Sequence, residues 1–165
     1  MLNYGAMAQL YFDYGADDLV NNHITGAAKE DIPEQAENDM TISGSIESIS
    51  FYGASLVFKD RIAVRYYFRY DGDLSQYSFS AGDLPITYII KDGMLCIEIA
   101  DILPQNLDQQ ITFTVTDADG SELSVTYGPM NYIVRMNEKG SETLQNLVKA
   151  LYNYHLAAKT LQETV

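Results

Sequence analysis

Tryptophan is absent from this sequence of 165 residues, and cysteine occurs only once. The single thiol, Cys96, excludes a disulfide within one chain and a cysteine-rich metal site. It lies in the apolar run 94–99, where a thiol usually acts as a small hydrophobic residue. Without tryptophan the chain lacks the commonest platform for stacking a sugar ring, so any such contact falls to its 13 tyrosines.

Positive charge is also scarce: 10 Lys and Arg residues stand against 23 Asp and Glu residues, giving a formal net charge of -13. A surface this negative repels phosphate backbones and anionic lipid headgroups, so we expect no nucleic-acid partner and no membrane insertion. No stretch approaches the roughly 18 consecutive apolar residues of a membrane span. The first residues also lack the pattern of a signal peptide, which indicates either a cytoplasmic protein or a piece of a larger one.

Histidine is limited to His23 and His155. Two histidines cannot build a histidine-rich metal site, and His155 lies on the apolar stripe of a predicted helix, which favours a packed residue over a ligand. Ser45 and Ser55 lack the flanking glycines of a nucleophile elbow. We therefore expect no catalytic residue, no cofactor and no metal, and the chain is not predicted to be an enzyme.

Acidic turns offer one alternative, a site for a hard cation. The stretch DADGSE at 117–122 does not fit an EF-hand, because aligning its glycine places Val115 at the first ligand position. A polar hairpin turn explains this stretch better, since Asp and Gly supply the turn geometry. Asp71, Asp73 and Asp83 remain as a second possible cation site in loops, set against acidic turns that are merely solvated.

Residues 1–15 predict an N-terminal helix. Tyr4, Ala8 and Tyr11 recur at helical spacing and form an apolar stripe that we expect to pack against another helix or the sandwich. No capping side chain precedes this stripe, so the helix either begins upstream in a longer protein or was cut. Gly15 is well placed to end it.

Residues 16–38 are acidic and weakly apolar, which is typical of a surface linker. From Met40 onward the hydrophobic period changes to two, which predicts strands separated by Asp and Gly turns. The expected strands are 40–47, 49–58, 61–70, 75–80, 86–91, 94–99, 109–116 and 121–127. This spacing predicts an antiparallel β-sandwich of about seven strands over 39–128, Ig-like in its strand count.

The sequence predicts helices in the C-terminal part of the chain, from residue 130 onward. A short helical turn is expected at 130–137, and Ser141 is placed to cap a long helix over 141–163. Leu151, Tyr154 and Ala158 belong to its apolar stripe, which is expected to pack against the N-terminal helix or the sandwich. The chain as a whole, 1–165, is therefore predicted to be a single α+β module.

The two predicted helices share a short sequence pattern. Residues 2–9, LNYGAMAQ, align with residues 152–159, YNYHLAAK, and match at Asn, Tyr and Ala with a constant offset of 150 residues. Two amphipathic helices can share such residues by chance. The alternative is a tandem array, in which the first helix is the closing helix of a preceding unit.

The pattern LNYGAMAQLYF at 2–12, followed by strands and by LYNYHLAAK at 151–159, resembles a module found in large secreted or surface proteins of anaerobic Gram-positive bacteria. In such proteins the module accompanies leucine-rich repeats, dockerins or carbohydrate-active domains. The resemblance covers nearly the whole chain, although its specific motifs are confined to the two helices. It implies an accessory or structural role without catalytic residues, and His155 departs from the small residue expected there.

The segment 59–70, KDRIAVRYYFRY, holds four of the ten cationic residues. Alternation places its apolar residues on one strand face and the cationic residues on the other. The cationic face carries Lys59, Arg61, Arg65 and Arg69, with Tyr67 between the last two. This face either pairs with acids on adjacent strands or binds a ligand, with Arg gripping carboxylate or sulfate and Tyr67 stacking on a sugar or peptide.

These observations predict a non-catalytic structural or adhesive module of a secreted or cell-surface protein. Its expected partners are neighbouring modules of the same polypeptide or a surface protein. The alternative is a carbohydrate-binding module that uses Arg61, Arg65, Tyr67 and Arg69. Composition favours an exported protein, because Tyr is frequent and Asp, Asn, Ser and Thr fill the turns.

Overall fold

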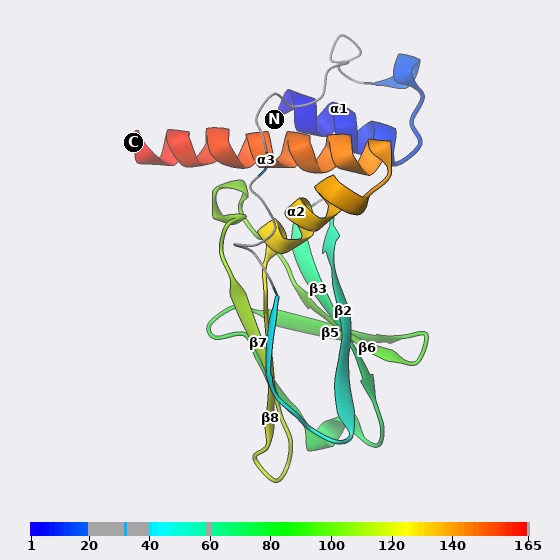
Figure 1. The fold of residues 1–165 in the computed structure, drawn as a ribbon, viewed down its shortest axis with the longest axis vertical. Coiled ribbons are helices and arrows are strands. Elements are labelled where there is room, and N and C mark those ends of the chain that lie inside the picture. Colours follow the sequence, from blue (N-terminus) through cyan, green and yellow to red (C-terminus); the bar gives the residue numbers. More distant parts are fainter. Residues whose placement is uncertain (20–31, 33–39, 59–60, 165) are drawn as a thin grey trace. The chain divides into compact units, whose positions relative to one another are not determined.

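A computed structural model describes residues 1–19, 32, 40–58 and 61–164 (Figure 1). The described chain divides into two compact units. One is a sandwich unit within 39–102 and 109–129, and the other is a helical unit within 1–38, 103–108 and 130–165. The helical unit collects segments from three parts of the chain, which hydrophobic periodicity alone does not reveal.

The sandwich unit consists of two antiparallel sheets of four strands each, so the predicted α+β class and antiparallel pairing are confirmed, with eight strands rather than about seven. The first sheet has the order β1 (Thr41–Gly44), β8 (Glu122–Tyr127), β7 (Ile111–Thr116) and β4 (Ser78–Ser80). The second has the order β2 (Ile49–Val57), β3 (Ala63–Tyr70), β6 (Met94–Ile99) and β5 (Ile86–Lys91).

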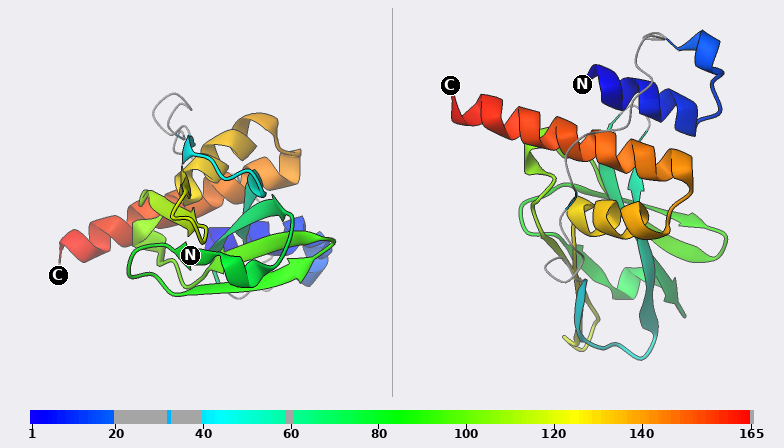
Figure 2. Two further views of the ribbon diagram at one scale, coloured as in Figure 1. Left: turned by 90° about the horizontal axis from the view of Figure 1, so that it is seen from below. Right: turned by 45° about the horizontal axis from the view of Figure 1, so that its top comes forward.

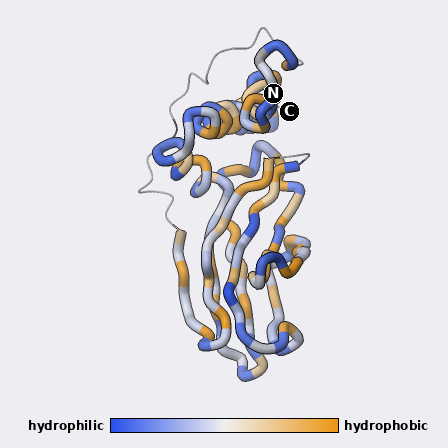
Figure 3. Tube along the Cα trace, turned by 90° about the vertical axis from the view of Figure 1, so that its right-hand side faces the viewer, coloured by the Kyte–Doolittle hydropathy of each residue, from blue (hydrophilic) through white to orange (hydrophobic). Residues whose placement is uncertain are grey.

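Aromatic residues fill the space between the two sheets. Tyr66 and Phe68 of β3 and Phe113 of β7 are fully buried, and the rings of Tyr66 and Phe113 stack with centroids 5.4 Å apart. Hydrophobic and hydrophilic residues alternate along the strands (Figure 3), as expected for strands with one face in a core. The alternation of period two, which set the predicted strands, is therefore a consequence of this core.

Two hairpins show how Asp and Gly supply the turns. Asp92 and Gly93, between β5 and β6, have φ values of 51° and 75°, the left-handed conformations that a two-residue hairpin requires. Between β7 and β8, the carboxylate of Asp117 accepts hydrogen bonds from the backbone N–H groups of Asp119 at 3.0 Å and Ser121 at 2.8 Å. The stretch 117–122 is thus a side-chain-stabilised hairpin turn, as predicted.

The helical unit contains α1 (Leu2–Tyr11), the short 3₁₀ helices η1 (Ala16–Asp18) and η4 (Pro104–Asn106), α2 (Pro129–Lys139, of which 130–139 belong to this unit) and α3 (Glu142–Glu163). The prediction that Gly15 ends the first helix is wrong, because α1 ends at Tyr11 and Asp13 adopts the left-handed conformation with φ 63°. The helical turn expected at 130–137 is a full helix of 11 residues.

α3 begins and packs as its sequence predicts. The Ser141 hydroxyl caps it by accepting a hydrogen bond from the Leu144 N–H at 3.4 Å. His155 is 3% exposed, and its Nδ1 donates to the carbonyl of Pro104 at 2.8 Å, so it is a packed helix residue. Lys159 forms an ion pair with Asp108 near the same place. His23 lies outside the described residues.

None of the helices in the described part of the chain is long and apolar enough to cross a membrane.

Candidate functional site

The outer face of the β2–β3–β6–β5 sheet carries the predicted ligand-binding residues. Val64, Tyr66 and Phe68 of β3 are fully buried, and alternation therefore turns Arg65, Tyr67 and Arg69 to the opposite face. Antiparallel pairing places Glu98 of β6 beside Arg65, and Cys96 beside Tyr67. We call the group Arg61, Arg65, Tyr67, Arg69, Cys96 and Glu98 the arginine face. Lys59 lies outside the described residues.

Two of the arginines share one carboxylate. Arg61 Nη2 donates to Glu98 Oε1 and Arg65 Nε donates to Glu98 Oε2, both at 2.7 Å. The side chain of Glu98 is 13% exposed, whereas those of Arg61 and Arg65 are 46% and 37% exposed. The pairing of these arginines with an acid on the adjacent strand is the structural alternative that the sequence left open.

This arrangement shifts the pKa of Glu98 and that of Arg65. Burial raises the pKa of Glu98, but the hydrogen bonds and positive charges of Arg65 and Arg61 outweigh it, so its pKa lies below the usual value. The hydrogen bond to Glu98 raises the pKa of Arg65. The three side chains therefore form a charged network with one net positive charge, held at the surface of the sheet.

Tyr67 and Arg69 of the arginine face also have partners on β2. The hydroxyl groups of Tyr67 and Ser55 are hydrogen-bonded at 3.0 Å. The guanidinium of Arg69 lies 4.5 Å from the centre of the Tyr52 ring, a cation–π contact. Tyr67 is half-buried.

A hollow of about 270 Å³ lies between the arginine face and β5, and its lining residues are Arg61, Arg65, Thr87, Tyr88, Ile89, Cys96 and Glu98. Cys96 is 3% exposed, and burial raises the pKa of its thiol. A thiol kept protonated in this way is a weak nucleophile. The hollow therefore offers hydrogen-bond donors from arginine and an acceptor from glutamate, which suits a small polar ligand better than covalent chemistry.

The acidic turns do not come together. Among the described residues, no group of three or more His, Cys, Asp or Glu side chains is placed to hold a metal ion, and this includes Asp71, Asp73 and Asp83. Asp73 instead accepts a hydrogen bond from the backbone N–H of Ser75 at 2.9 Å and caps the 3₁₀ helix η3 (Leu74–Gln76). In this structure it therefore stabilises a turn.

The predicted helix-packing residues meet in the helical unit. α1 runs antiparallel to α3 along its N-terminal half (Figures 1 and 2), and the rings of Tyr4 and Tyr154 stack with centroids 5.9 Å apart. Burial, and then the proximity of Tyr154, raise the pKa of Tyr4 to about 12. Leu151 is fully buried, whereas Ala8, Tyr11 and Ala158 are half-buried.

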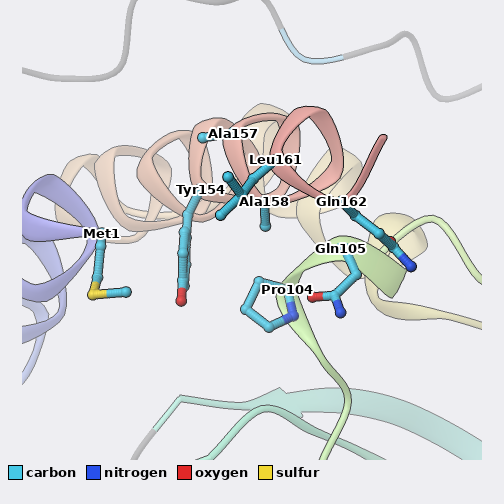
Figure 4. A pocket seen from close by; sticks show the side chains of 8 residues that line it. All are labelled: Met1, Pro104, Gln105, Tyr154, Ala157, Ala158, Leu161 and Gln162. Atoms are coloured by element: carbon cyan, nitrogen blue, oxygen red, sulfur yellow. The ribbon is translucent and has the colours of Figure 1, made fainter. Parts of the chain in front are cut away.

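Beyond α1, the last turns of α3 border a second hollow of about 670 Å³ (Figure 4). Its lining residues are Met1, Pro104, Gln105, Tyr154, Ala157, Ala158, Leu161 and Gln162. Leu161 is 67% exposed. The sequence identified Tyr154 and Ala158, but it gave no signal for Met1 and Pro104, which reach the hollow from distant parts of the chain.

No family model, no curated protein and no solved structure matches this chain.

Proposed function

We propose that this chain is a non-catalytic structural or adhesive module of a modular protein, secreted or displayed at the cell surface. In this role it spaces neighbouring modules of the same polypeptide or contacts a surface protein. The observation that best supports the proposal is the stacking of Tyr4 on Tyr154, because these are equivalent residues of the two similar helical segments. The sandwich then acts as an Ig-like spacer, a comparison based on the expected count of about seven strands, whereas the structure has eight.

The exposed end of α3 supports a tandem arrangement. At the offset of 150 residues, the face of α3 that borders the larger hollow corresponds to the face of α1 formed by Tyr4, Met7, Ala8 and Tyr11. In α1, Met7 is 3% exposed, whereas its equivalent Ala157 is exposed in α3. We infer that, in a tandem protein, the end of α3 serves as the first helix of the next unit.

A two-unit protein tests this proposal. Residues 1–161 of one copy are joined directly to residues 12–165 of a second, so that the end of α3 replaces α1 of the second unit. Ala157→Cys in the first copy is expected to react with maleimide much more slowly than the same variant of the single chain, because the second unit covers it. Asp119→Cys, on an exposed hairpin turn, is the control and reacts equally in both proteins.

Equal labelling of Ala157→Cys in the single and the two-unit protein would contradict the tandem arrangement. The native thiol of Cys96 adds little background, because it is 3% exposed.

A carbohydrate-binding module is the second candidate, and the hollow beside Arg61 and Arg65 favours it. Arginine and glutamate side chains bordering a small surface hollow can hydrogen-bond to sugar hydroxyls. The ion pairs with Glu98 weigh against an anionic glycan, because they already neutralise part of the arginine charge. A glycan-dependent rise in melting temperature that is lost in Arg65→Ala, and retained in Tyr14→Ala of the helical unit, would favour this candidate.

A further inference from the structure

The edge strand β5 exposes apolar side chains on both of its faces. It pairs with β6 through residues 86–91, and among the described residues no strand pairs with its other side. Tyr88 and Ile89 are each 56% exposed and Ile90 is 49% exposed. The segment 86–90, ITYII, contains no charge. An edge of this kind presents unpaired backbone donors and acceptors next to apolar side chains, which is a template for another strand.

The other three sheet edges differ from β5. β4 has only three residues and β1 only four. β2 is long, but its pairing shifts between Phe51 and Gly53, which marks a β-bulge. Short strands and bulges are the usual protection of an edge against pairing with another chain. β5 has neither, so it is the edge on which a further strand can extend the ladder.

The alternation of β5 fits a second copy of itself. In an antiparallel pair related by a two-fold axis through Tyr88, residues whose numbers sum to 176 lie opposite each other. Tyr88 then faces Tyr88, Ile86 faces Ile90, and Thr87 faces Ile89. Each apolar residue on the sandwich side of the sheet thus meets an apolar residue. Lys91 lies opposite Pro85 at the end of the ladder, so no like charges are directly opposed.

We propose that two copies of this chain associate through β5, antiparallel and centred on Tyr88, to form one continuous eight-stranded sheet from their two four-stranded sheets. This inference is independent of the tandem arrangement, because it uses the sandwich unit alone. A strand of six residues provides a small contact, so the association is weak and reversible. With a net charge of -13 on each copy, it strengthens as salt screens the repulsion.

Sedimentation velocity of the full chain over a range of concentrations, at low and moderate salt, tests the proposal. The wild-type protein is expected to dimerise, more strongly at the higher salt. Tyr88→Lys and Tyr88→Glu are each expected to weaken the dimer by about tenfold or more, because like charges would then lie directly opposite. Tyr52→Lys is the matched control, because Tyr52 is 57% exposed on the opposite edge of the same sheet and should leave dimerisation unchanged.

An equimolar mixture of Tyr88→Lys and Tyr88→Glu distinguishes the antiparallel register centred on Tyr88 from nonspecific association. Lys and Glu would face each other in the mixed pair, so the mixture is expected to recover the dimer that each variant has lost. Circular dichroism establishes that both variants are folded. The proposal would be overturned if the wild-type protein stays monomeric and binds an extended peptide at β5 instead. It would also be overturned if the mixture of the two variants fails to associate. An equal loss of dimerisation in Tyr52→Lys would overturn the proposal as well.

Discussion

The hydroxyl of Tyr66 on β3 donates a hydrogen bond to the backbone carbonyl of Tyr127 on β8 at 2.8 Å, and so joins the two sheets through the core. The carbonyl of Ile111 on β7 lies 3.2 Å from the same hydroxyl. Burial raises the pKa of Tyr66 well above its usual value, so the hydroxyl keeps its proton as a donor.

Tyr66→Phe is therefore expected to destabilise the sandwich by about 1–2 kcal/mol, because it leaves buried carbonyl oxygens without this donor. Urea unfolding measures the change. Tyr67→Phe is the control, since its hydroxyl is hydrogen-bonded to the half-buried Ser55 hydroxyl on the outer face of the sheet, and its loss should cost less. An equal effect of the two variants would contradict the role of Tyr66 in joining the sheets.

The carboxylate of Glu98 makes stability dependent on acid pH. Because its pKa in the folded protein is lowered, its contribution is complete above its pKa in the unfolded chain and is lost as the pH falls through its folded pKa. Glu98→Gln is expected to cost roughly 0.5–1 kcal/mol at neutral pH, since its arginine partners are partly exposed. It also flattens the acid side of the stability profile. Glu122→Gln, at an exposed position of β8, should leave that profile unchanged.

Gly44 combines a left-handed backbone with a close approach. Its φ is 72°, and a Cβ there would lie 2.1 Å from the carbonyl oxygen of Glu122. Gly72 has a φ of 90°, but a Cβ added to Gly72 would have no other atom within 4 Å. Gly72→Ala should therefore cost only the conformational strain of about 1 kcal/mol, whereas Gly44→Ala also displaces β1 from β8. Thermal unfolding compares the two, and similar losses would refute the steric argument.

The stack of Tyr4 on Tyr154 predicts the effect of a change in α1. Tyr4→Ala removes ring burial and the aromatic contact, and is expected to destabilise the helical unit by about 1–3 kcal/mol. Hydrogen exchange of α3 amides reports on this unit directly. Tyr14→Ala is the control because Tyr14 is 55% exposed. Unchanged exchange in Tyr4→Ala would show that α1 does not hold α3 in place.

Most strands were predictable from the sequence, because a core on one face imposes the period of two that the sequence displays. The exact bounds 86–91 and 94–99 follow from the Asp92 and Gly93 turn between them. The helix ends were less predictable. Gly15 was the expected stop, yet Asp13 took the left-handed conformation, which Asp tolerates better than most residues.

The composition of the arginine face was predictable only in part. Alternation along β3 places Arg65, Tyr67 and Arg69 together, but it carries no information about the neighbouring strands. That Glu98 lies beside Arg65 depends on β6 pairing with β3, a contact between residues 33 positions apart. The exposed edge of β5 was hidden for the same reason, since ITYII reads equally well as a buried strand.

We propose that this module contacts proteins rather than binding a glycan through the arginine face. A glycan array probed with the purified full chain, with and without calcium, tests it most directly. We expect no saturable binding to any glycan class in either condition. Saturable binding that Arg65→Ala abolishes, with Asp119→Ala unaffected, would contradict it and make the arginine face a carbohydrate site.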